Sequence, residues 1–271
     1  MPLISIITAC YNHGIYLDEA FESVQLDKYK DIFEHIIVND GSTDAFTLQK
    51  LNDLEQKGVK VIHQLNCGLA KARNAGIAIA EGKYILPLDS DNKIIPEVFL
   101  KALEMLEADE RVSAVYTDAW YFGSRKNLWK IGELDIDVLL NRNYIDACAL
   151  LRTKDIEEVG LYDSSMPYMG NEDWELWVNL LSKKKNILYL QEPGFYYRII
   201  ENSMSFQYTI PGYVKNKAYI FKKHADFVSN RFFYLLQKKE WVELNFSTLQ
   251  NKLSNNRLHS ILKILFGRKF Y

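Results

Sequence analysis

The stretch Leu86-Pro87-Leu88-Asp89-Ser90-Asp91-Asn92 joins an apolar run to two aspartates that are two residues apart. In extended backbone, residues i and i+2 point to the same side, so both carboxylates are expected on one face. Two such carboxylates repel each other unless a cation lies near them, and Mg²⁺ or Mn²⁺ suits one or two carboxylates plus diphosphate oxygens. The alternative is an Asx turn and a cap for the helix that starts near Pro96. The motifs that precede this stretch in the sequence favour a metal site over a turn and cap.

Four short apolar runs with β-branched residues lie in the first ninety residues, and each is expected to form a buried strand. Segments of helical spacing separate them, which predicts right-handed crossovers and a mainly parallel sheet covered on both faces. The expected strands are Leu3 to Ala9, His35 to Val38, Val59 to His63 and Tyr84 to Leu88, and the expected helices lie around 17–24, 46–54 and 69–80.

Polar, Gly or Asx residues follow every one of these strands, at the sheet edge where ligands bind. Turn residues and helix caps are the alternative for any single loop, but four loops meet at one edge. The carboxylate of Asp40, which precedes Gly41-Ser42-Thr43-Asp44, can accept a hydrogen bond from a base or a ribose hydroxyl. No Gly-x-Gly-x-x-Gly lies near it, which argues against a dinucleotide cofactor.

The helix expected from Leu69 carries possible anion donors close to its start, namely Lys71, Arg73 and Asn74. Donors and a helix N-terminus together favour an anion. A charged, solvated face is the alternative interpretation.

A second section contains an expected strand from Val112 to Tyr121, a loop around Gly123 to Gly132 and a helix that begins near Asn171, its expected N-cap. The helix places Trp174, Trp177, Val178 and Leu181 on one face, with Asp173 at the edge of that face and Glu172 nearly opposite. Acidic residues in a first turn are also ordinary partners of the helix dipole. The same dipole keeps a carboxylate ionised, as a general base requires.

The composition is that of an ordinary globular protein, with 271 residues, 48% hydrophobic, 25% charged and a formal net charge of −2. Such a balance creates no overall field for nucleic acid, so we expect no nucleic-acid partner. Cys10, Cys67 and Cys148 fit neither a disulfide framework nor a metal site. The first residues lack a signal sequence and no run is long enough to span a membrane, so we expect a cytoplasmic protein, soluble or peripherally bound.

Taken in order, these motifs resemble the inverting glycosyltransferases of family 2, which have the GT-A fold. Each motif alone is weak, whereas the ordered set, over roughly residues 3 to 205, is specific. The matching stretches are 5–12, 36–44, 68–74, 88–91, 159–163, Glu172-Asp173-Trp174 and Tyr197-Arg198.

The resemblance implies an α/β fold with a Rossmann-like, mainly parallel sheet flanked by helices, and a helical C-terminal tail. The GT-A domain would span residues 1–210, with a nucleotide-binding half at 1–95 and an acceptor half at 96–210. Residues 211–271 would form the helical extension.

The resemblance also implies a hexosyltransferase-type enzyme (EC 2.4) in cell-surface polysaccharide or glycan synthesis. It would move a sugar from a nucleotide sugar, usually a UDP-sugar, to a hydroxyl of a saccharide or lipid-linked acceptor. Asp173 would be the catalytic base and Asp91 would bind Mn²⁺ or Mg²⁺. The residues implied at the nucleotide are Ala9, Tyr11, Asp40, Arg73 and Asp89.

One position departs from the family pattern. Many relatives have a histidine two residues after the Tyr-Arg pair, where this chain has Ile200. Water or another residue would then complete the metal shell. Arg198 and Ser203 are expected to contribute to a lid over the diphosphate.

Glu172 and Trp129 are candidates for acceptor contacts, since aromatic rings stack on the apolar faces of sugars, while Trp120 is expected in the core. Residues 257–271 predict a basic amphipathic helix. It could contact the inner face of the cell membrane, or pack on the catalytic domain or on another subunit of a homo-oligomer. The choice stays open.

Two rival functions remain. A nucleotidyltransferase would carry a Gly-rich basic loop after its first strand, which Ala9-Cys10-Tyr11-Asn12-His13 lacks. A nucleotide-sugar-binding protein without turnover would not need Asp173, so the presence of both Asp91 and Asp173 favours the enzyme. No feature of the sequence identifies the sugar.

Overall fold

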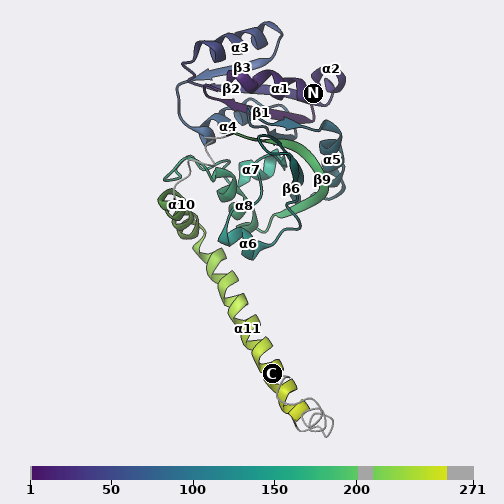
Figure 1. Cartoon of the computed structure of the whole chain (residues 1–271), viewed down its shortest axis with the longest axis vertical. Coiled ribbons are helices and arrows are strands. Elements are labelled where there is room, and N and C mark those ends of the chain that lie inside the picture. The colour runs from purple at the N-terminus through teal and green to yellow at the C-terminus, as the bar shows by residue number, and fades with distance from the viewer. Residues whose placement is uncertain (1, 201–209, 255–271) are drawn as a thin grey trace. The chain divides into compact units, whose positions relative to one another are not determined.

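The structure is a computed structural model that describes residues 2–200 and 210–254. The chain divides into two compact units, Met1–Lys223 and His224–Tyr271 (Figure 1). Ser203 and residues 257–271, which carry two of the sequence predictions, lie outside the described residues.

The first unit contains one nine-stranded sheet. Its strands are β1 (Ile4–Cys10), β2 (Phe33–Asp40), β3 (Lys60–Gln64), β4 (Tyr84–Pro87), β5 (Lys93–Ile94), β6 (Val112–Gly123), β7 (Asn127–Trp129), β8 (Leu150–Arg152) and β9 (Asn186–Ile199). Its helices are α1 (Gly14–Val24), α2 (Leu26–Tyr29), α3 (Ala45–Gln56), α4 (Leu69–Ala78), α5 (Pro96–Ala108), α6 (Ile136–Asn141), α7 (Thr153–Glu158), α8 (Glu172–Ser182) and α10 (Ile210–Lys223). The second unit contains α11 (Ala225–Ser254).

The strand order is β3-β2-β1-β4-β8-β6-β9-β5, with β7 paired to β6. Strands β1 to β4 pair in parallel, as the sequence predicts. Beyond β4 the sheet is mixed, because β8 is antiparallel to both β4 and β6 while β6 and β9 are parallel. The α/β fold is therefore confirmed, and the parallel arrangement belongs to its first half.

The main core lies between the sheet and helices α1 and α5. Strand β1 lies between β2 and β4 and is buried at every residue except Ala9, as strands covered on both faces are. Phe99 and Leu106 of α5 pack with Ile4 and Leu86 in this core. Helix α4 contacts β1 and β2, and a Cβ at Gly76 would come within 2.5 Å of Ile7 Cγ2, so glycine permits that approach. Together these contacts fix the loops that follow β1, β2 and β4.

Two expectations about single segments are corrected, and a third holds without the expected side-chain contact. The loop expected at Gly123 to Gly132 contains β7, which pairs with β6. Trp120, expected in the core, is 39% exposed because it lies past the buried part of β6. Asn171 is the N-cap residue of α8, as expected, although its side chain makes no cap hydrogen bond.

Helix α10 belongs to the first unit, which therefore extends past the predicted boundary at residue 210. The physical reason is Asn216, whose side chain is fully buried. Its amide donates to the carbonyls of Tyr168 (3.0 Å) and Gly170 (2.9 Å) and accepts from the Tyr168 N–H (3.0 Å). Helix α10 is thus tied to the loop before α8. None of the helices in the described ranges combines the length and apolar character that a membrane span requires.

Candidate active site

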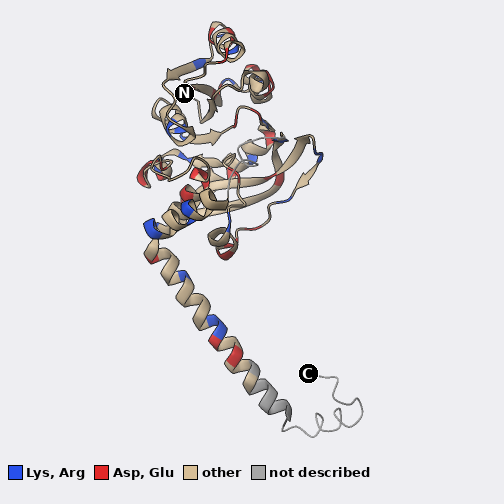
Figure 2. Ribbon diagram, turned by 60° about the vertical axis from the view of Figure 1, so that its left-hand side comes forward, with Lys and Arg blue, Asp and Glu red and all other residues tan. Residues whose placement is uncertain are grey.

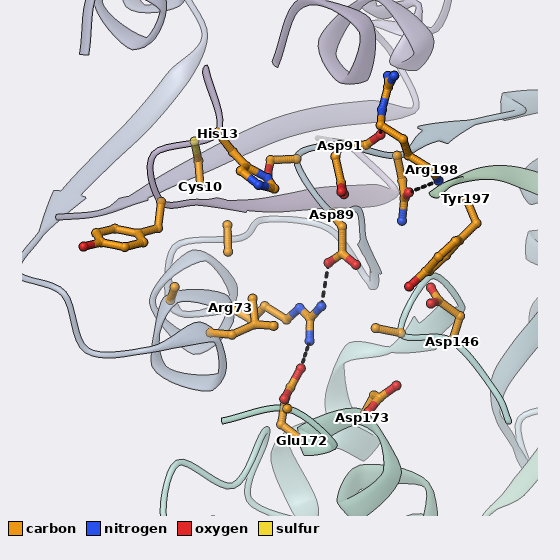
Figure 3. Close-up of a pocket in the computed structure, with 18 of the residues that line it drawn as sticks. Cys10, His13, Arg73, Asp89, Asp91, Asp146, Glu172, Asp173, Tyr197 and Arg198 are labelled. Carbon is orange, nitrogen blue, oxygen red and sulfur yellow. Dashed lines mark hydrogen bonds and ion pairs between the residues drawn. The ribbon is translucent and has the colours of Figure 1, made fainter. Parts of the chain in front are cut away.

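A cavity of about 910 Å³ opens where the loops after β1, β2 and β4 meet the start of α8 (Figure 3). Side chains from both predicted halves of the domain line it. The predicted site residues among its lining are Ala9, Tyr11, Asp40, Arg73, Asp89, Asp91, Trp129, Glu172, Asp173 and Arg198.

Arg73 of α4 is the positive centre of this cavity. Its guanidinium donates to Asp89 Oδ1 at 2.7 Å and to Glu172 Oε1 at 2.5 Å (Figure 3). It also packs on the ring of Tyr162. Burial lowers the pKa of Arg73, but Asp89 and Glu172 outweigh it and raise the pKa well above its ordinary value. Arg73 therefore bridges the loop after β4 and the start of α8.

Glu172 is only 5% exposed, although the helical wheel places it opposite the packed face of α8. Helix α8 is buried on more than one side. Glu172 faces Arg73, and Trp174 and Trp177 are buried on the opposite side of the helix. A carboxylate can be buried here because a guanidinium compensates its charge. Glu172 thus lies away from the indoles, as expected, but the side of the helix that it occupies is buried as well.

Asn74 makes contacts different from those expected at an anion site. Its amide donates to the carbonyl of Tyr162 (2.8 Å) and accepts from the Tyr162 N–H (3.1 Å). This side chain therefore holds the loop after α7, while Lys71 is exposed.

The backbone at Asp89-Ser90-Asp91 turns instead of staying extended. The N–H of Asn92 donates to the carbonyl of Asp89 at 3.0 Å, so the extended geometry expected for the two aspartates is wrong. Both still line the cavity, with Asp89 facing Arg73 (Figure 3). The cap alternative is not observed either, because Ile95 is the N-cap of α5.

The Asp91 carboxylate lies in an environment that suits a cation. Burial and the neighbouring charge of Asp89 raise the pKa of Asp91 to about 7. Arg198 donates to the backbone carbonyl of Asp91 (2.8 Å) and to Glu19 Oε1 (2.7 Å), so its guanidinium does not neutralise the Asp91 carboxylate by a hydrogen bond. A divalent cation would do so, and the residues present fit one.

Protein ligands for such a cation are few. Over residues 2–200 and 210–254, no group of three or more His, Cys, Asp and Glu side chains could hold a metal ion. Asp91, with Asp89 beside it, would need diphosphate oxygens and water to complete the shell. Ile200 lines the cavity and offers no ligand.

Asp40 at the end of β2 is 4% exposed and holds the start of α4. Its Oδ1 accepts from Gln64 Nε2 (2.7 Å) and the Cys67 N–H (2.9 Å), and its Oδ2 accepts from the Gly68 N–H (2.9 Å). Carboxylate oxygens accept about four hydrogen bonds in total. The three protein donors orient Asp40 and leave it able to accept one more hydrogen bond, and Asp40 lines the cavity.

Asp173 is positioned by the way α8 begins. Gly170 and Asn171 both have positive φ (94° and 66°), which turns the chain sharply into the helix. Trp174 donates from its indole to the carbonyl of Leu139 at 2.7 Å, and Trp177 to that of Ile145 at 3.2 Å. These buried indoles anchor α8 on α6 and on the segment before β8, which fixes the position of the Asp173 carboxylate beside them.

The carboxylate of Asp173 is held at both oxygens. Asn143 Nδ2 donates to Asp173 Oδ2 at 2.9 Å, and the Trp174 N–H donates to Oδ1 at 2.8 Å. Burial first, and Glu172 second, raise the pKa of Asp173 to about 7. A carboxylate with a pKa near neutrality suits general base chemistry.

Sequence reasoning did not identify Asn143 and Asp146. Both lie in the segment before β8 and line the cavity. Burial and the charges of Asp89 and Asp173 raise the pKa of Asp146 to about 8. In spacing and composition this segment is like any polar loop. Only its contact with α8 in the folded protein reveals its role in the site.

Trp129 of β7 lies at the edge of the cavity within an aromatic group. Its ring stacks on Tyr121 (centroids 5.3 Å apart) and meets Tyr197 edge to face (5.4 Å). This packing holds the indole partly exposed beside the cavity.

Comparisons with known proteins place the chain in a family. Residues 5–160 match the family described as Glycosyl transferase family 2. The chain is 32% identical over 212 residues to WfaP of Escherichia coli, a UDP-Glc:alpha-D-GlcNAc-diphosphoundecaprenol beta-1,3-glucosyltransferase, with 76% of this chain and 80% of WfaP covered. It is 30% identical over 212 residues to an uncharacterized glycosyltransferase of Haemophilus influenzae, with 76% and 82% covered.

The fold is similar to that of S. aureus TarS. The crystal structure of TarS 1-349 in complex with UDP-GlcNAc superposes with a TM-score of 0.64 at 20% identity, covering 86% of this chain and 73% of that one. The match to the longer TarS structure covers 37% of its length. The chain therefore belongs to glycosyl transferase family 2, has the GT-A fold and is a glycosyltransferase.

Proposed function

We propose that this enzyme transfers a sugar from a UDP-sugar to a hydroxyl of a saccharide acceptor, free or lipid-linked, with inversion at the anomeric carbon. The observation that most supports this proposal is that Asp173, with its raised pKa, lines the same cavity as Asp40, Asp89 and Asp91. The name of WfaP, with its UDP-glucose donor and diphospholipid acceptor, supports the donor class and a role in polysaccharide synthesis.

The donor nucleotide is proposed to lie along the carboxyl ends of β1, β2 and β4. Asp40 has an oriented carboxylate there for the base, and Tyr11 is half-exposed at the mouth of the cavity. Asp89, held by Arg73, has one oxygen left for the ribose. Arg73 then acts through Asp89 and Glu172, with its two terminal nitrogens already bonded to them.

Asp173 is the proposed base. Its ionised carboxylate accepts the proton of the acceptor hydroxyl, and the hydroxyl oxygen forms a bond to the anomeric carbon. The bond from that carbon to the diphosphate oxygen breaks on the opposite face, which inverts the configuration. Two hydrogen bonds to Asp173 hold it in one orientation before the acceptor arrives, which reduces the entropic cost of reaching the transition state.

Asp91 is proposed to hold Mn²⁺ or Mg²⁺ beside the diphosphate. A bound divalent cation supplies neutralisation of the charge that develops on the leaving diphosphate. Arg198 keeps the Asp91 turn in place through its bonds to the Asp91 carbonyl and the Asn92 amide oxygen (2.8 Å each).

The acceptor is proposed to enter beside Trp129, whose ring is held partly exposed at the cavity edge. Glu172 acts indirectly, since its Oε1 is bonded to Arg73. We accordingly assign residues 1–95 to donor binding and the remainder of the sheet-containing unit to acceptor binding.

The experiment that tests the donor class is thermal unfolding of the full chain with a panel of nucleotide sugars, with and without Mn²⁺. A ligand at 100 times its Kd adds about 2.7 kcal/mol, which is readily detected. We expect UDP-sugars to stabilise the wild type more when Mn²⁺ is present, and Asp91→Ala to lose the metal-dependent part. Stabilisation by none of the nucleotides would overturn the proposed function. Stabilisation without release of UDP in the presence of saccharide acceptors would favour a binding protein without turnover.

A further inference from the structure

Helix α11 has a regular apolar spacing that the catalytic site does not use. Val228, Phe232, Leu235, Lys239 and Val242 follow one another at alternating steps of four and three residues. In the amino-acid sequence the same steps lead on to apolar residues at 246, 249 and 253. Alternating steps of three and four residues define positions a and d of a heptad repeat. Apart from Lys239, every position in this series is apolar.

Among the residues that the structure describes, the side chains of this series as far as Val242 remain at least partly exposed. Phe232 is 57% exposed and Val242 is 50% exposed, while Val228 and Leu235 are partly buried. A straight helix presents residues three and four apart on one face, so the series forms an apolar stripe along α11, while Phe233, Trp241 and Leu244 are exposed outside it. The heptad spacing of the stripe fits the corresponding stripe of a second helix.

We propose that α11 is a dimerisation helix, which forms a parallel two-stranded coiled coil with α11 of a second copy of this chain. Val228, Leu235 and Val242 occupy d positions, and Phe232 and Lys239 occupy a positions. Lys239 favours two strands, because its long stem covers the apolar seam while its ammonium group reaches water. One lysine at an a position also fixes the register of the two helices.

Charge supports the parallel orientation. In this register Lys238 is at position g and Glu243 is at position e of the next heptad. A parallel pair places Lys238 opposite the partner's Glu243, and Glu243 opposite the partner's Lys238. Figure 2 shows a basic band and an acidic band next to each other in the middle of α11. The dimer would hold two catalytic units together without any contribution of α11 to the transfer chemistry.

The first test is the mass of the full chain in solution, measured by size-exclusion chromatography with light scattering. We expect twice the chain mass of 31.6 kDa. Val242→Asp introduces a charge into the seam and should give a monomer. Leu244→Asp is the matched control, because Leu244 is 68% exposed, lies two residues away and occupies position f outside the seam. It should remain a dimer.

Orientation is tested by disulfide crosslinking in a Cys67→Ser background, since Cys67 is exposed while Cys10 and Cys148 are buried. Leu235→Cys should crosslink two chains on mild oxidation, because equal d positions meet in a parallel pair. Leu244→Cys should not. The proposal would be overturned if the wild type were a monomer, or if Val242→Asp and Leu244→Asp dissociated the dimer equally. It would also be overturned if Leu244→Cys crosslinked and Leu235→Cys did not. A monomer that floats with anionic vesicles, and no longer floats as Val242→Asp, would assign the stripe to a membrane surface and overturn it as well.

Discussion

Asn143 donates a hydrogen bond of 2.9 Å from its Nδ2 to Oδ2 of Asp173, thirty residues along the chain. Asn143 lies in the segment before β8 and Asp173 in the first turn of α8. The same segment accepts the indole of Trp177 at the carbonyl of Ile145. Asn143 is therefore a positioning residue for the proposed base, and it favours the ionised form of that base by hydrogen bonding.

Asn143→Ala should lower kcat about 10-fold or more with little change in the KM for the donor, because a loosely held base reaches the productive geometry less often. Steady-state kinetics with the donor found by the nucleotide panel would measure this. Asn141→Ala is the matched control, since Asn141 contacts Lys217 rather than Asp173. Equal losses in both variants would show that the effect is structural.

Asp173→Asn should abolish most transfer, by about 10²- to 10⁴-fold, because an amide cannot accept the acceptor proton. Stabilisation of the variant by UDP should match that of the wild type, since the nucleotide is proposed to bind elsewhere in the cavity. Transfer assays and thermal unfolding with UDP measure the two effects separately. Retained turnover would exclude Asp173 as the base.

The rate of transfer should rise with pH through about 7 and then level off, since Asp173 has a pKa raised to about 7 and acts only when ionised. Asn143→Ala should move this limb to higher pH, because the lost hydrogen bond favoured the ionised form. Glu172→Gln should move it to lower pH, because a neighbouring negative charge is removed. A pH profile of kcat/KM for the three proteins would check both directions. If the rise in kcat/KM near pH 7 stayed at the same pH in both variants, it would reflect the ionisation of a residue other than Asp173.

Asp173→Asn should also be more stable than the wild type at pH 8, by about 1–2 kcal/mol. The folded state has the higher pKa, so ionisation of Asp173 costs stability as pH rises from 3.8 toward 7. An asparagine at this position cannot ionise, so the variant does not lose this stability. The difference in the free energy of unfolding between the variant and the wild type should therefore shrink when the pH is lowered to about 5. Urea unfolding at the two pH values would measure it. A destabilised variant at pH 8 would mean that the ionised carboxylate has a partner that compensates its burial.

Glu172→Gln should destabilise the protein by about 3 kcal/mol or more, because it removes one of two carboxylates that compensate the buried Arg73. Glu192→Gln is the control. It breaks the Lys101–Glu192 pair, whose side chains are 53% and 40% exposed, and should cost less than about 1 kcal/mol. Urea unfolding midpoints of both variants test the contrast. Similar costs would mean that the Arg73–Glu172 pair is worth no more than a surface pair.

Much of the first half of the fold could be predicted from local sequence. Strands β1 to β4 and helices α1, α3 and α4 follow from short apolar runs and helical periodicity, which are properties of neighbouring residues. The edge of the sheet that carries the cavity follows from the rule for parallel strands. The turn at Asp89-Ser90-Asp91 and strand β7 were missed, because a few residues of turn or strand have no periodicity to detect.

What the sequence by itself determined is the order of motifs, the α/β class and the candidate residues at the strand ends, since each depends on residue types at short spacing. Only the tertiary structure decided which charges meet. Arg73 and Glu172 are 99 residues apart and form a buried pair, and Asn143 reaches Asp173 from a loop with no motif of its own. The reason is physical. The burial of Glu172 and the pKa of Asp173 depend on what packs around both sides of α8, and residues far apart along the chain supply that packing.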